Sequence, residues 1–148
     1  KLLIVGGGKN LTIYKKRYSH EKIQFTGSVF GKDLIKIYQN SSFFVFPSSS
    51  ESWGLVINEA MSSSLPIIAH KEVGAVYDLI LGKDTGYLIR NCDELEAKML
   101  QVYNNHDICK KYSDNSRNLM ETYWNYSLYK TNLLKTMDKI DTWQSARK

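Results

Sequence analysis

The chain has 148 residues, of which 43% are hydrophobic, and a formal net charge of +5. A chain of this length fits one domain and buries about two-thirds of its unfolded surface, so we expect a packed core. The lysines are spread along the sequence, and aromatic residues do not alternate with them as a base-stacking platform would require, which argues against a nucleic-acid-binding protein. A run of about 18 apolar residues, the length that spans a bilayer, does not occur.

The cysteines and the N-terminus bear on the cellular location of the protein and on whether the chain is a fragment. Cys92 and Cys109 have no further cysteines or histidines at the spacing of a zinc site, so we interpret them as reduced thiols in a cytoplasmic protein. The N-terminus lacks the charged and then apolar layout of a signal peptide. Because the chain begins with Lys1 and a strand-like apolar run follows at once, we interpret it as a fragment cut at an internal boundary.

Apolar runs and helical periods alternate along the chain. Runs rich in β-branched and aromatic residues predict strands at residues 2–5, 23–26, 43–46, 66–69 and, more weakly, 87–89. Helical periods predict helices from residue 31 or 33, over 55–61, from 93, over 109–120 and over 127–140. Strands buried on both faces and alternating with helices predict a parallel sheet with helices on both sides. The expected fold class is α/β, a Rossmann-like three-layer domain with a helical C-terminus.

Residues 43–69 read in order as a strand, a loop, a helix and a strand. In open α/β sheets ligands bind beyond the carboxyl ends of the strands, which places the loop over 47–53 at the cleft. We expect Ser52 to cap the helix and the N–H groups of Gly54, Leu55 and Val56 to stay unpaired, where the helix dipole favours negative charge. That arrangement suits a diphosphate, and Gly54 would let the phosphate oxygens approach the backbone.

Two glutamates flank this anion site. Glu51 precedes the helix and Glu59 lies within it, at a separation of about 8–10 Å along the helix axis. A nucleotide diphosphosugar has the same linear order, so one carboxylate could accept hydrogen bonds from sugar hydroxyls and the other from the ribose. Because Glu59 stands among apolar residues, we expect it to be buried and to need such a partner. In the alternative interpretation, Glu51 is a solvated loop residue and Glu59 pairs with a lysine.

The segment over 47–61, PSSSESWGLVINEAM, resembles the signature of glycosyltransferase family 4, in which two glutamates are separated by seven residues. Members of that family are retaining enzymes with the GT-B fold, which has two Rossmann-like domains. The resemblance covers nearly all of residues 1–140 and implies that residues 1–148 form the C-terminal, donor-binding domain. Its other segments follow in order: LLIVGGG at 2–8, IQFTGSV at 23–29, LIKIYQNSSFFVFPS at 34–48, LPIIA at 65–69, GAVYDLI at 74–80 and DTGYLI at 84–89.

The resemblance implies a role for each matching residue. Glu51, the candidate catalytic residue, would hold hydroxyls of the donor sugar, and Glu59 would hold the ribose. Backbone N–H groups at the helix start would bind the phosphates, and the turn after the second strand would meet the nucleobase. A glycine turn after the first strand would line the cleft near the donor, or be only a tight turn. These backbone sites are Trp53, Gly54, Leu55 and Val56 for the phosphates and sugar, Gly27, Ser28 and Val29 for the base, and Gly7 and Gly8 for the cleft.

Other parts of the family's active site fall outside this sequence, and two positions depart from its pattern. The basic pair that clamps the diphosphate lies upstream, and the N-terminal acceptor domain is absent, so the isolated chain is expected to bind donor weakly and to transfer sugar poorly or not at all. Trp53 replaces a common phenylalanine, and Ala75 replaces the second glycine of a frequent pair.

The resemblance also implies a reaction and a setting. It implies hexosyl transfer in polysaccharide or glycoconjugate biosynthesis, without a metal ion or another cofactor. The partners it implies are a nucleotide-sugar donor and the missing N-terminal domain. The full enzyme is expected in the cytoplasm, where peripheral association with the inner face of the membrane stays an open alternative. The nucleobase, sugar, anomer and acceptor stay open.

Three other interpretations were weighed against the residues. A GT-B relative such as a nucleotide-sugar epimerase or a sugar phosphorylase would share the fold, but the string ESWGLVINEA argues against both. A non-catalytic nucleotide-sugar-binding module stays open, although Glu51 and Glu59 are both present. A nicotinamide-binding Rossmann domain fails, because Leu11 stands where a third glycine is required and the second strand ends without an acidic ribose ligand.

Two expectations concern the surface. An isolated donor-binding half should expose apolar surface over residues 124–134 or along the rim of the first strand. His70, at the end of a predicted strand, is the one histidine expected to reach the cleft.

Overall fold

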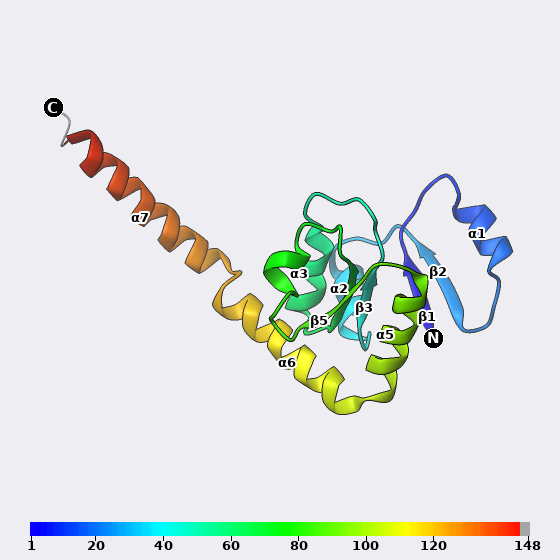
Figure 1. Ribbon diagram of the computed structural model, residues 1–148. Helices are drawn as coiled ribbons and strands as arrows, with labels where there is room; N and C mark the ends of the chain where they lie inside the picture. The colour runs from blue at the N-terminus through cyan, green and yellow to red at the C-terminus, as the bar shows by residue number, and fades with distance from the viewer. Residues whose placement is uncertain (146–148) are drawn as a thin grey trace. The chain divides into compact units, whose positions relative to one another are not determined.

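The computed structural model describes residues 1–145, in which strands and helices alternate (Figure 1). The contacts divide the chain into two compact units, one over Lys1–Asn40 and one that begins at Ser41, and each is described by itself. The first unit contains β1 (Leu2–Val5), α1 (Leu11–Arg17), β2 (Ile23–Gly27) and α2 (Gly31–Gln39). The second contains β3 (Phe44–Phe46), α3 (Leu55–Ser62), β4 (Ile67–His70), α4 (Val76–Leu79), β5 (Gly86–Ile89), α5 (Cys92–Asn104), α6 (His106–Thr122) and α7 (Tyr126–Ser145).

The first unit is built on a parallel pair of strands. β1 pairs with β2 from Leu2 opposite Ile23 to Val5 opposite Gly27, with a shift of register before Val5. The expectation that the strands are buried on both faces is wrong for β1, because Leu2 is 42% and Ile4 is 37% exposed. The prediction of an exposed apolar rim on the first strand is confirmed by the same residues.

The second unit is built on a three-stranded parallel sheet in the order β3-β4-β5. The central strand, β4, has the continuous apolar run that a strand covered on both faces requires, and Ile67, Ile68 and Ala69 are fully buried. Ile68 joins a core cluster with Ile89 of β5 and Val102 of α5. Burial therefore concentrates around β4, the neighbour of β3, and the carboxyl end of β3 leads into the segment with the predicted site.

The helices of the second unit begin at recognisable caps. Asn91 Oδ1 accepts the Glu94 N–H (2.9 Å) at the start of α5, and Asn105 Oδ1 accepts the Ile108 N–H (3.0 Å) at the start of α6. α3 packs on α6 through a buried face that contains Ile57. None of the helices within residues 1–145 is long and apolar enough to cross a membrane.

The observed elements match the predicted ones closely. The fold class is confirmed: parallel strands alternate with helices, and the C-terminus is helical. The sequence predicted one sheet, whereas the strands pair in two, because each sheet lies within one of the two units. The helices α1 and α4 were not predicted. The expected apolar surface over residues 124–134 is confirmed, since Tyr126 is 92% and Leu134 50% exposed.

Candidate functional site

The loop with Glu51 follows β3 at its carboxyl end, as predicted, and neighbouring backbone holds it in place. Gly74 N–H donates to Glu51 O (3.0 Å), and Ala75 N–H donates to Trp53 O (2.9 Å). A side chain at Gly74 would collide with Ser52 O. The segment between β4 and α4 therefore fixes the backbone of the loop from one side.

The start of α3 differs from the prediction in one respect. Its N-cap is Gly54 in the left-handed region (φ 93°, ψ 61°), and no side chain caps the helix, so the expectation that Ser52 is the cap is wrong. A Cβ at Gly54 would lie 2.9 Å from Val73 Cγ1 and 3.2 Å from Phe46 Cε1. The glycine is thus required by its φ value and by close packing, apart from any access it gives to a phosphate.

The first turn of α3 presents open backbone donors. The first helical N–H with a recorded backbone acceptor is that of Ile57, which donates to Gly54 O (2.9 Å). Within residues 1–145, the N–H groups of Leu55 and Val56 have no hydrogen-bond acceptor. In the described part of the chain the N–H groups of Leu55 and Val56 are therefore unpaired, as predicted, even though no side chain caps the helix.

The two glutamates are both exposed. For Glu59 this contradicts the expectation of a buried carboxylate. α3 turns its Ile57, Ala60 and Met61 toward the core, and at 100° per residue Glu59 falls on the opposite side of the helix. Both carboxylates are accordingly accessible to solvent.

The Trp53 side chain makes contacts that the sequence did not reveal. Its Nε1–H donates to Asn58 Oδ1 (2.9 Å), and its ring packs on Trp124 with centroids 5.2 Å apart and planes tilted by 37°. Asn58 Nδ2 in turn contacts Met120 Sδ at 3.9 Å. The loop with Glu51 is thereby linked to α3, to α6 and to the connection between α6 and α7.

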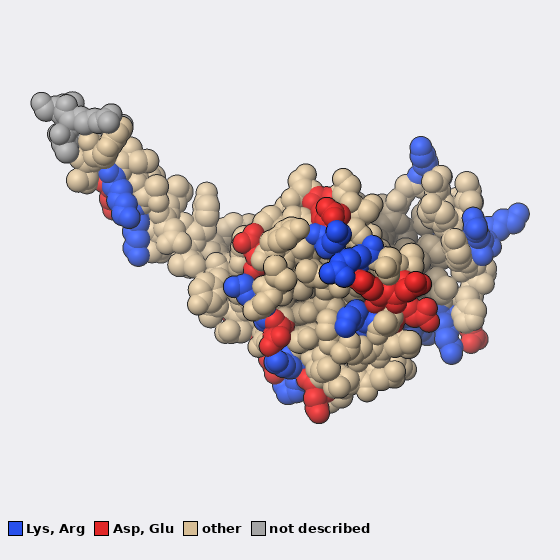
Figure 2. Space-filling view, in the orientation of Figure 1, with Lys and Arg blue, Asp and Glu red and all other residues tan. Residues whose placement is uncertain are grey.

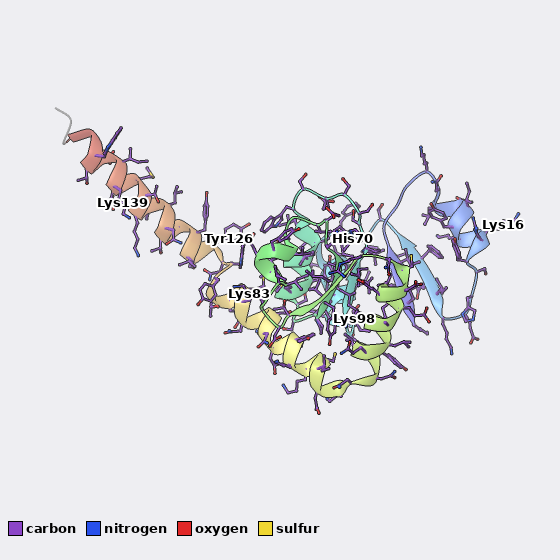
Figure 3. The ribbon with its side chains drawn as sticks, viewed as in Figure 1. Lys16, His70, Lys83, Lys98, Tyr126 and Lys139 are labelled. Carbon is purple, nitrogen blue, oxygen red and sulfur yellow. The ribbon has the colours of Figure 1, made fainter. Side chains whose placement is uncertain are left out.

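A groove of about 680 Å³ lies beside this cluster, between α3, the end of α6 and the start of α7. Its walls include Asn58, Glu59 and Trp124, together with Tyr126, which Figure 3 labels at the start of α7. Leu55 and Glu59 are the predicted site residues that line this groove.

The remaining predicted residues lie in the first unit, at the ends of β1 and β2. Gly6 N–H donates to Gly27 O (2.9 Å), which brings the two strand ends together. A Cβ at Gly7 would lie 2.5 Å from Ser28 Oγ, so Gly7 and Ser28 are neighbours. Gly8 and Ser28 are exposed, and Val29 is half-buried. The structure thus gathers Gly7, Ser28 and the backbone of Gly27 at one edge of the two-stranded sheet.

His70 ends β4 (Figure 3) and is half-buried. Its Nε2 lies 3.2 Å from Arg90 O, and its Nδ1 accepts the Glu72 N–H (3.3 Å). Both ring nitrogens are engaged with backbone, which indicates a structural role rather than the expected contact with the cleft.

Several basic side chains of the second unit form ion pairs with acids. Lys110 pairs with Asp114 (2.8 Å) and Lys111 with Asp84 (2.7 Å), and Figure 2 shows acidic and basic groups side by side on its visible face. Exposed pairs of this kind contribute little stability. Among residues 1–145 no cluster of three His, Cys, Asp or Glu side chains is arranged to hold a metal ion.

Comparison with known proteins decides the family. The model of the family "Glycosyl transferases group 1" matches residues 1–119. The chain belongs to this family. Its fold is that of the C-terminal half of GT-B glycosyltransferases, as the solved structures show. The predicted resemblance to glycosyltransferase family 4 is confirmed.

Individual relatives and solved structures agree with this family assignment. The chain is 36% identical over 80 residues to the sulfoquinovosyl transferase SQD2 of Arabidopsis thaliana, which covers 54% of this chain and 16% of that protein. Sucrose-phosphate synthase from Thermosynechococcus elongatus superposes with a TM-score of 0.81 at 20% identity, over 95% of this chain and 38% of that one. Anabaena HepE in complex with UDP-glucose gives a TM-score of 0.76 at 18% identity, over 93% and 40%.

The chain spans about a third or less of the curated relatives it matches first, with shares of 16%, 35%, 26% and 35% of their lengths.

Proposed function

We propose that this chain binds the nucleotide diphosphosugar donor of a retaining glycosyltransferase. The observation that carries the proposal is the start of α3, where the N–H groups of Leu55 and Val56 open at the carboxyl end of β3 between two exposed carboxylates, Glu51 and Glu59. Family membership supports it, because the match over residues 1–119 includes the whole of this segment.

In this proposal each group acts on one part of the donor. The helix start holds the diphosphate through N–H groups and the helix dipole, which stabilise the charge that grows on the leaving nucleoside diphosphate. Glu59 accepts hydrogen bonds from the ribose hydroxyls, and Glu51 from hydroxyls of the sugar. Glu51 then acts as a positioning group whose hydrogen bonds strengthen in the transition state while the acceptor attacks from the same face. The sugar is expected to be a hexose.

UDP is the first nucleotide to test, because HepE was solved with UDP-glucose. Calorimetry with UDP, GDP and ADP on the wild type, on Glu59→Ala and on a control variant, Glu96→Ala, measures the ribose contact. Glu96 is an exposed carboxylate of α5. A hydrogen bond to a charged group contributes about 1.5–3 kcal/mol, so Glu59→Ala should weaken the nucleotide about tenfold or more and Glu96→Ala should not. Equal affinities for all three proteins would refute the ribose role.

A second comparison separates the sugar contact from the nucleotide contact. With UDP-glucose against UDP, Glu51→Ala should lose about tenfold in affinity for the sugar nucleotide and little for UDP. An equal loss for both ligands would show that Glu51 does not contact the sugar. Chemical-shift changes at Gly27 and Ser28 on addition of nucleotide would test the proposed base contact in the first unit.

The setting of the whole protein is part of the proposal. We propose that an acceptor domain belongs to another part of the whole protein, and that the chain by itself binds donor weakly and transfers little or no sugar. We propose that the transfer needs no divalent metal, which is checked by nucleotide-sugar binding in EDTA and in Mg²⁺. We also propose that the whole enzyme is cytoplasmic and that it could associate peripherally with the inner face of the membrane.

A further inference from the structure

The connection between α6 and α7 lies against the loop that carries Glu51. Trp124, in that connection, packs its ring on the Trp53 ring at a centroid distance of 5.2 Å. Trp53 lies between Glu51 and the N-cap of α3, Gly54. A displacement of the Trp53 side chain therefore acts on the backbone that presents both the carboxylate and the anion-binding N–H groups.

Two further contacts restrict Trp53. Its Nε1–H donates to Asn58 Oδ1 (2.9 Å) on the side of α3, and its backbone oxygen accepts the Ala75 N–H (2.9 Å). The indole is held by the polar contact with Asn58 of α3 and by the ring contact with Trp124, and the backbone of Trp53 is held by Ala75. Of these three, the Trp124 contact is the one made by the side chain of a residue outside the strand, loop and helix of the donor site.

We propose that Trp124 is a positioning residue for the donor sugar: through Trp53 it sets the placement of the Glu51–Gly54 loop. The inference rests on the proposed donor-binding function and names a specificity determinant of that same site. Its consequence is selective. Glu59 lies on the regular part of α3 and keeps its place without Trp124, whereas the loop with Glu51 does not, so sugar recognition depends on Trp124 more than nucleotide recognition does.

Trp124 is 43% exposed and Met120, which closes the other side of Asn58, is 5% exposed. The accessible half of Trp124 also forms part of the groove beside α3. Replacement of the Trp124 ring should therefore alter the loop without removing a core residue.

The first test measures the ratio of the dissociation constants for UDP and UDP-glucose. Trp124→Ala should lower the affinity for UDP-glucose roughly threefold to tenfold, as loss of an aromatic pair would, and change the affinity for UDP less than about twofold. Trp124→Phe keeps a ring and should restore most of the ratio. Tyr103→Ala, a change at a 78% exposed aromatic residue of α5, is the control and should leave the ratio unchanged.

The second test needs no ligand. Hydrogen exchange at the amides of Gly74 and Ala75, which donate to Glu51 O and Trp53 O of the loop, should become several-fold faster in Trp124→Ala, while exchange in β4 stays as in the wild type. If exchange rises equally in β4, or UDP and UDP-glucose weaken equally, Trp124 only stabilises the fold and the proposal is overturned. An unchanged ratio with unchanged exchange overturns it as well.

The two proposals fail in different ways. Absence of any nucleotide binding by the wild type refutes donor binding, while the exchange measurement still decides whether Trp124 positions the loop. Wild-type binding with a sugar preference that depends on Glu51 but not on Trp124 supports donor binding and refutes the positioning role.

Discussion

Replacement of Gly54 by alanine should destabilise the second unit strongly. A residue other than glycine in the left-handed region costs about 1–2 kcal/mol, and Gly54 has φ 93°. The added methyl would also lie 2.9 Å from Val73 Cγ1 and 3.2 Å from Phe46 Cε1, and overpacking of this kind costs about 1–3 kcal/mol. The expected loss in the free energy of unfolding is therefore about 2–5 kcal/mol, or a fall in Tm of about 6–15 °C at roughly 3 °C per kcal/mol.

Urea denaturation followed by tryptophan fluorescence measures this loss in the relevant part of the chain, because all 3 tryptophans lie after residue 41. The matched control is Gly82→Ala. Gly82 also has a positive φ, 69°, but a Cβ there meets no heavy atom within 4 Å. The free energy of unfolding of Gly82→Ala should therefore fall only by the cost of the left-handed backbone, about 1 kcal/mol. Equal losses for the two variants would refute the packing contribution, and a loss below about 0.5 kcal/mol at Gly54 would refute the strain as well.

Three further predictions concern other parts of the second unit. Burial raises the pKa of the Cys109 thiol, so at pH 8 Cys109 should react with iodoacetamide more slowly than exposed Cys92, and urea should remove the difference. Burial, and second its contact with Tyr87, raises the pKa of the Tyr112 hydroxyl. The stability that the protonated Tyr112 contributes is therefore complete below the unfolded pKa of about 10 and is lost as the pH rises above that value. Tyr112→Phe should flatten this alkaline decline of the free energy of unfolding in urea titrations. Asn105→Ala removes the cap of α6 and should cost about 1 kcal/mol by the same titration, whereas no loss would show that the cap is dispensable.

Most of the fold could be predicted because its elements carry strong local patterns. β4 is a continuous apolar run, and α3, α5 and α6 combine helical period with definite ends. The two helices that were not predicted lack such patterns. α1 has no buried residue, and α4 has four residues, which is little more than one turn and too short for a period to appear.

The candidate site was predicted in position but not in all its details. The sequence placed Glu51 and the start of α3 correctly, because ligand loops follow strands in α/β folds. It was wrong on the burial of Glu59, although the helical period contained the answer: Ile57 and Met61 are four apart and share the buried face, and Glu59 falls between them on the other side. The contact of Trp53 with Trp124 joins residues 71 positions apart, and no local pattern reports such a pair.

The two residues that follow Val73 differ in how well the loop tolerates a side chain at each position. Ala75 replaces a frequent glycine, yet it has φ −61° and is fully buried without strain, while its N–H still donates to Trp53 O. Gly74 has no such freedom, because a Cβ would collide with Ser52 O. The loop is therefore held by contacts that do not depend on a ligand, those of Gly74 and Ala75 and the ring contact of Trp53 with Trp124, so a donor would meet preformed N–H groups and lose little affinity to ordering of the loop. In the role proposed for Trp124, the Trp53 side chain is the group through which that distant residue acts on the loop with Glu51.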